Sequence, residues 1–207
     1  MSQPMAAARP RFETSTIVLM GVAIALNAVV GQLVGNVLKL PLYGDSIGTV
    51  LVGVLAGPLA GVLTGVLSNV VWGLALPNAS TTIPFAITSA VIGLLAGLAG
   101  RRGLFAARRA PTGGIVVAVV GFLVGLVAAV VSAPIAYFVF GGSTGGGTDL
   151  LVGVLRNFTD NAFTATLLQS GVSDPIDKTV VFLLVWFILL SLPASVKLLF
   201  PQGDRST

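Results

Sequence analysis

Four long stretches of the sequence carry no charged residue: residues 14–38, 46–100, 110–148 and 179–196. A helix that crosses the hydrocarbon core of a membrane needs about 20 mostly apolar residues. Backbone groups in lipid must be hydrogen-bonded within their own segment, so long apolar runs predict helices. The composition agrees, because 55% of the residues are hydrophobic and 9% are charged, against roughly 25% charged in soluble domains. We therefore expect an all-α, polytopic membrane bundle.

The chain contains neither cysteine nor histidine. Disulfides, Cys or His zinc sites and Ser-His or Cys-His catalytic pairs are therefore excluded. The sequence also lacks a phosphate-binding loop of the G-x-x-x-x-G-K-[ST] type. We expect a binding protein rather than an enzyme, without cofactor or metal, that takes energy from another subunit.

Turn-forming residues divide the apolar stretches into six predicted helices, at residues 16–38, 46–56, 59–76, 83–100, 113–140 and 179–200. The second is too short to span a membrane alone. Residues 149–170 form a further apolar segment that either crosses the membrane, giving seven spans, or is re-entrant, giving six. Basic residues near the C-terminus favour six. We expect one membrane domain, residues 16–200, with tails at 1–15 and 201–207.

Basic residues gather in two segments, 9–11 and 101–109, which hold six of the eleven in the chain. An even number of predicted spans separates the two segments, so both lie on one face. The positive-inside rule makes that face cytoplasmic. We expect a multi-pass protein of the cell membrane with a cytoplasmic N-terminus. Asp45, Asp149, Asp174 and Asp177 are then expected in outer loops.

Polar side chains are expensive to bury in lipid and therefore tend to mark functional sites. The first candidates are Tyr43 and Asp45, in the turn-rich segment 39–46 that joins the first two predicted helices. This segment either contributes to a ligand site or is an interfacial loop in which Lys39 and Tyr43 anchor the headgroup region.

Asn69, Trp72 and Asn78 form a second group, at the outer end of the predicted span 59–76. Asn69 and Trp72 are three residues apart and share a helical face. A Trp beside an Asn can stack on a flat ring while the amide binds the edge of that ring. The alternative is an aromatic-belt Trp with an Asn bonded to a neighbouring helix. We favour the ligand role for Asn69 and the belt role for Trp72.

Arg156, Asn157, Asp160 and Asn161 form a third group, within the apolar segment 149–170. Arg156 and Asp160 are four residues apart, which is the spacing of a helical ion pair. A structural ion pair would not require the additional amides, so we interpret the stripe as one wall of a polar pocket. The chemistry of the three groups fits a flat, neutral or zwitterionic ligand such as a heterocycle.

Small residues four apart let helices approach closely in lipid. Gly53, Gly57, Gly61 and Gly65 repeat at this spacing, and packing within the bundle explains most such rows. On the first predicted helix, Gly21 and Ala25 are either packing residues or a docking face for another membrane subunit.

Residues 40–65 read LPLYGDSIGTVLVGVLAGPLAGVLTG, and residues 173–178 read SDPIDK. Both stretches resemble the substrate-binding S components of energy-coupling-factor (ECF) transporters. The resemblance implies a six-helix membrane protein that binds a vitamin or similar micronutrient on the outer side, under the loop after the first helix. It also implies docking on a transmembrane coupling subunit with two ABC ATPases, through an A-x-x-x-A pattern that Gly21 and Ala25 match with Gly in first place.

The expected partners are therefore the coupling subunit, the two ATPases, a micronutrient and the lipid bilayer, with no nucleic acid. Two other functions stay open. A stand-alone secondary transporter would need internal inverted repeats or a coupling-ion site. A non-transporting sensor or assembly subunit would need a partner surface beyond the membrane.

Overall fold

The computed structural model describes residues 12–76, 79–106 and 112–206. Within these residues the fold is all-α and contains no strand. The helices are α1 (Thr14–Gly31), α2 (Ile47–Ala56), α3 (Pro58–Ala75), α4 (Ala86–Arg101), α5 (Thr112–Phe140), α6 (Thr148–Leu155), α7 (Ala162–Ser191) and α8 (Ala194–Lys197). A π-helical turn, η1 (Gln32–Val37), extends α1. The short 3₁₀ helix η2 (Ser80–Phe85) precedes α4, and a second one, η3 (Gly203–Ser206), follows α8.

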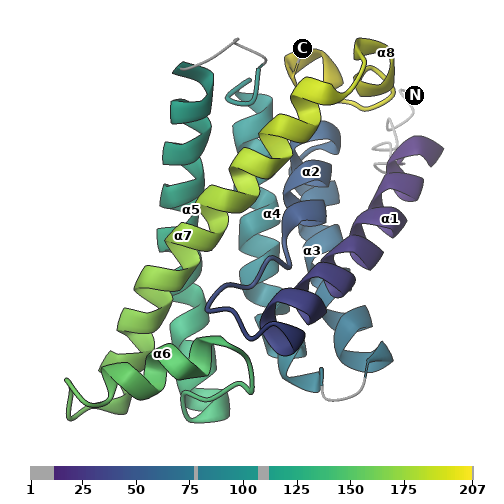
Figure 1. Ribbon diagram of the computed structural model, residues 1–207. Helices are drawn as coiled ribbons and strands as arrows, with labels where there is room; N and C mark the ends of the chain where they lie inside the picture. The colour runs from purple at the N-terminus through teal and green to yellow at the C-terminus, as the bar shows by residue number, and fades with distance from the viewer. Residues whose placement is uncertain (1–11, 77–78, 107–111, 207) are drawn as a thin grey trace, which may run out of the picture.

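The long helices run side by side between two ends of the molecule (Figure 1). The first turn of α1, the last turn of α4 and η3 lie at one end, which we call the terminal end. Helix α6 lies across the opposite end, which we call the α6 end. The short helix α2 is at the centre, where Val50, Val52 and Val54 have at most 1% exposure.

Four helical segments of the described chain are long and apolar enough to cross a membrane: Thr14–Val37, Pro58–Ala75, Ser80–Arg101 and Thr112–Phe140. Large apolar side chains such as Leu74 and Phe138 point outwards and are about three-quarters exposed. Soluble proteins rarely expose apolar surface on this scale, so the exposed side chains indicate a membrane protein. The all-α class is thus confirmed, whereas the count of six spans stays a prediction.

Close backbone contacts explain the glycine row that the sequence shows. Gly57 has a φ of 102° and ends α2, and Pro58 then begins α3 at a position that favours proline. A Cβ atom at Gly61 or Gly65 would collide with the backbone of α4. The row therefore serves packing inside the bundle.

The structure corrects the prediction for the last third of the chain. Residues 149–170 do not form one helix, because α6 ends at Leu155 and Asn161 caps a new helix by accepting a hydrogen bond from Phe163 N at 2.8 Å. Helix α7 then continues for 30 residues through the segment 174–178 that we expected in an outer loop. Asp177 and Lys178 are accommodated there because they pair with each other and with the loop after α1, and Asp174 accepts a hydrogen bond from Ser132 on α5.

The predicted helix 179–200 is also wrong in its bounds. Helix α7 ends at Ser191, and the chain then turns back across the terminal end. Gln202 N donates to Leu55 O at 2.8 Å, and Arg205 Nη1 donates to Arg101 O at 2.6 Å. This segment caps the carbonyl groups at the ends of α2 and α4.

Candidate ligand-binding cavity

A cavity of about 120 Å³ lies inside the bundle, towards the α6 end. Its walls come from the ends of α1 and η1, from the loop that follows them (residues 38–46), from α3, η2, α4, α5, α6 and α7, and from the glycine-rich segment 141–147. The glycine-rich segment packs against the end of η1 and the start of this loop, because Gly147 N donates to Gly35 O at 3.1 Å and a Cβ at Gly147 would collide with the backbone of Lys39 and Leu40.

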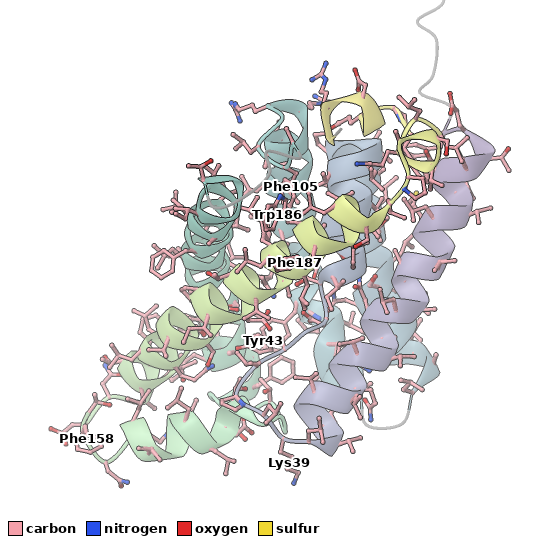
Figure 2. All side chains as sticks on the ribbon, turned by 45° about the horizontal axis from the view of Figure 1, so that its top comes forward. Lys39, Tyr43, Phe105, Phe158, Trp186 and Phe187 are labelled. Carbon is pink, nitrogen blue, oxygen red and sulfur yellow. The ribbon has the colours of Figure 1, made fainter. Side chains whose placement is uncertain are left out.

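Aromatic rings form one side of the cavity. Trp72 and Phe85 line it together with Tyr43, which lies inside the bundle beside α7 (Figure 2). The indole N–H of Trp72 donates to Gln32 Oε1 at 3.2 Å, and the Tyr43 hydroxyl accepts from Gln169 Nε2 at 3.3 Å. Burial raises the pKa of the Tyr43 phenol well above its ordinary value, so the hydroxyl keeps its proton.

A charged cluster joins the loop after α1 to α7. The Lys178 ammonium pairs with Asp177 and lies 3.7 Å from Asp45 Oδ1. The other carboxylate oxygen of Asp177 accepts from Tyr43 N at 3.0 Å and from Gly44 N at 2.8 Å. Burial raises the pKa of the Asp45 carboxyl, and the charge of Lys178 opposes that rise. Asp177 therefore fixes the loop, whereas Asp45 and Lys178 face the cavity.

Polar groups from three further helices complete the walls. Asn69 on α3 donates to Ser89 Oγ on α4 at 2.6 Å and to Gly65 O at 3.1 Å. Asp174 on α7 accepts from Ser132 Oγ on α5 at 2.8 Å. The cavity can therefore hold a small polar molecule by hydrogen bonds while its aromatic side covers a ring.

Four of the candidates from the sequence line this one cavity: Tyr43, Asp45, Asn69 and Trp72. They come from two segments that are well separated along the chain, and the fold brings them together. Asn78 lies outside the described residues. Their contact with a ligand stays a prediction.

Arg156, Asn157, Asp160 and Asn161 are exposed and do not line the cavity. They lie in the turn between α6 and α7, whose Phe158 points to the outside in Figure 2. Arg156 Nη2 donates to Gly141 O at 2.9 Å instead of pairing with Asp160. These side chains do not form the predicted polar stripe, because α6 ends before them and α7 begins after them, so no single helix aligns them.

The sequence interpretation missed the contribution of α7. Ser170, Asp174 and Lys178 line the cavity and are four residues apart, so they share one helical face. That spacing was visible in the sequence, but Pro175 and the neighbouring charges favoured a loop. Thr88 and Ser132 also line the cavity and carry no motif that distinguishes them, whereas Gln169 is a polar residue of the segment 149–170 that we expected to form a pocket wall, and it does line the cavity.

The candidate docking residues Gly21 and Ala25 are exposed on α1. No heavy atom lies within 4 Å of the position that a Cβ would take at Gly21. These residues therefore form an open surface on α1.

Comparisons of the chain with protein-family models, with curated proteins and with solved structures gave no match.

Proposed function

We propose that the protein is the membrane-embedded substrate-binding subunit of an ECF-type importer, and that it captures a vitamin-like or heterocyclic micronutrient. The cavity under the loop after α1 is the observation that carries this proposal. It combines aromatic walls with amide, hydroxyl and charged groups inside an otherwise apolar bundle. Polar groups at such a position are expensive to maintain unless they bind something.

The orientation of the bundle gives the cavity access from outside the cell. Arg101 ends α4 and Arg102 follows it, so both lie at the terminal end, where α1 also begins. The positive-inside rule makes this end cytoplasmic. The cavity lies towards the α6 end, and so the loop after α1 and the segment 141–147 cover it on the outer side.

Energy for transport comes from partners in this proposal. The exposed Gly21 and Ala25 on α1 form a flat surface on which a transmembrane coupling subunit with two ABC ATPases can dock. Two alternatives remain. A stand-alone secondary transporter would be driven by an ion gradient, and a non-transporting sensor would bind the ligand without moving it.

Mass spectrometry of compounds released from the purified, detergent-solubilised protein tests the binding role. We expect a stoichiometric heterocyclic compound in the wild type, retention of that compound in Asn157→Ala, and its loss in Asn69→Ala. The two variants remove the same amide, once from the cavity and once from an exposed turn. Loss in both variants or in neither would place the site elsewhere.

Uptake into proteoliposomes tests the transport role. We expect uptake of the retained compound only when the coupling subunit, its ATPases and ATP are present. Uptake by this chain alone, driven by an ion gradient, would instead identify a secondary transporter. Binding without uptake under either condition would favour the sensor.

A further inference from the structure

We propose that the ligand is an organic cation, a flat ring that carries a protonated amine, an amidine or a quaternary nitrogen, and that Asp174 is its counter-ion. This inference rests on the proposed function, because it assumes that the cavity holds a small molecule. It departs from the sequence interpretation, which expected a neutral or zwitterionic ligand.

The charged groups of the cavity are predominantly acidic. Asp45, Asp149 and Asp174 line it, and Lys178 is the lining residue with a positive charge among the described residues. The ammonium of Lys178 is already engaged by Asp177 and Asp45. Arg156, which would have balanced the charge, lies outside the cavity. The lining therefore has more negative than positive charge.

Asp149 does not need a ligand, because the glycine-rich segment satisfies its carboxylate. Thr144 N and Gly145 N donate to it at 3.0 and 2.8 Å, and Ser143 Oγ donates at 2.7 Å. A carboxylate that accepts several hydrogen bonds is stabilised without a counter-ion. Asp149 shapes the loop, which leaves Asp174 as the lining carboxylate that forms no ion pair among the described residues.

Asp174 is 2% exposed and receives one hydrogen bond, from the Ser132 hydroxyl. Among the described residues, the ion pairs of Lys178 go to Asp45 and Asp177, and none reaches Asp174. A buried carboxylate without a paired cation is strongly unfavourable. A cationic group in the cavity would supply the missing partner.

The hydrogen-bonding groups of the cavity point to the same ligand. Thr88 lines the cavity and is 6% exposed, and its buried hydroxyl has no hydrogen-bond partner in the described part of the structure. The amide nitrogen of Asn69 is used up by Gly65 and Ser89, and the indole N–H of Trp72 is used by Gln32. The Thr88 hydroxyl and the Asp174 carboxylate can therefore still accept from an N–H group of a ligand, whereas the N–H groups of Asn69 and Trp72 are engaged within the protein.

The walls distinguish an organic cation from a metal ion. Trp72, Tyr43 and Phe85 present aromatic surface to the cavity, and aromatic faces attract organic cations. Within the described residues, no three Asp, Glu, His or Cys side chains are grouped as metal ligands would be. The aromatic surface would contribute nothing to a small hydrated metal ion.

A matched series of ring compounds tests the inference on the full-length protein in detergent. Benzamidine, benzamide and benzoate have the same ring and nearly the same shape, but they are cationic, neutral and anionic. We expect wild-type protein to bind benzamidine most tightly. Asp174→Asn should weaken benzamidine binding by about 30-fold or more, because it removes one partner of a buried charge pair. Its Kd for benzamide should change little.

Glu13→Gln provides the control, because it makes the same chemical change at an exposed carboxylate on the terminal end. The wild-type series does not depend on any variant folding, and the net charge of the compound retained on purification gives a second readout. Tightest binding of benzamide or benzoate, or a retained compound that is neutral or anionic, would overturn the charge assignment and leave the binding role intact. Absence of both a retained compound and binding in the series would overturn both proposals.

Discussion

Asp177 connects α7 to the loop after α1, and both oxygens of its carboxylate accept hydrogen bonds. One oxygen accepts from the backbone of Tyr43 and Gly44, and the other accepts from Lys178. The side chain is buried. Its removal would leave two backbone N–H groups and an ammonium without their partner, and each of these is costly inside a protein.

At the residue scale, we therefore expect Asp177→Ala to lower the free energy of unfolding by about 3–5 kcal/mol. It should also make the loop after α1 easier to cleave by protease, because its anchor on α7 is lost. Chemical or thermal unfolding in detergent measures the first effect, and limited proteolysis measures the second. Asp160→Ala, at an exposed turn, should change stability by less than about 0.5 kcal/mol. Equal stability of the two variants would contradict the anchoring role of Asp177.

The residues that line the cavity differ in how readily the local sequence pattern identifies them as site residues. Asn69 and Trp72 share a helical face at a spacing of three, and Asp45 follows an aromatic residue in a turn, so local pattern alone selects them. Asp174 and Lys178 share a face as well, but a proline and three charges within five residues also resemble a loop. Burial decides between the two readings, and local sequence does not report burial.

At the scale of elements, helix α1 contains two glycines in opposite environments. Gly31 is buried against α3, and a Cβ there would lie 2.6 Å from Cη2 of Trp72. Gly21 is exposed, with no heavy atom within 4 Å of the same position. The packing of Trp72 thus depends on the missing side chain at Gly31.

We expect Gly31→Ala to destabilise the protein by about 1–3 kcal/mol, because the added methyl group overpacks the contact with Trp72. It should also weaken retention of the cavity compound, since the indole ring must move. Gly21→Ala should be neutral, or stabilising by up to about 1 kcal/mol, because it replaces an exposed helical glycine. Thermal unfolding and mass spectrometry of the retained compound check both variants. A similar loss in both would mean that helix α1 as a whole, and not the contact at Gly31, is sensitive.

The break between α6 and α7 shows how one local signal outweighs apolar continuity. Residues 149–170 are apolar enough to suggest one helix, yet Asn161 caps a new helix and α6 has already ended at Leu155. Asn at the start of a helix satisfies an N–H group that the first turn leaves free. The capping residue was present in the sequence, but its neighbours made it look like part of a polar stripe.

At the scale of the whole molecule, the terminal end and the α6 end should lie on opposite sides of the membrane. The chain contains no cysteine, so single cysteines report their own accessibility. We expect Asn157→Cys to react with a membrane-impermeant maleimide on intact cells. Glu13→Cys should react only after the membrane is permeabilised. Both positions are exposed in the structure, so burial in the protein does not confound the comparison. The reverse labelling pattern would place the cavity on the cytoplasmic side.

The sequence by itself determined the class of this protein. Long charge-free stretches leave the backbone no alternative to helices in an apolar solvent. The turn at Gly57-Pro58 separates two helices as predicted, and α3 ends at Ala75 before η2 begins at Ser80. These properties follow from composition and short-range pattern, so they need no knowledge of the folded contacts.

Only the tertiary structure decided which polar residues meet. Asp177 binds Tyr43 and Gly44 across 134 and 133 positions of sequence. That contact lets charged residues lie inside α7 instead of in a loop. The same packing leaves Arg156 at the surface and Asp174 in the cavity. The free energy of a buried charge depends on its partners, and partners this distant are set by the fold rather than by neighbouring residues.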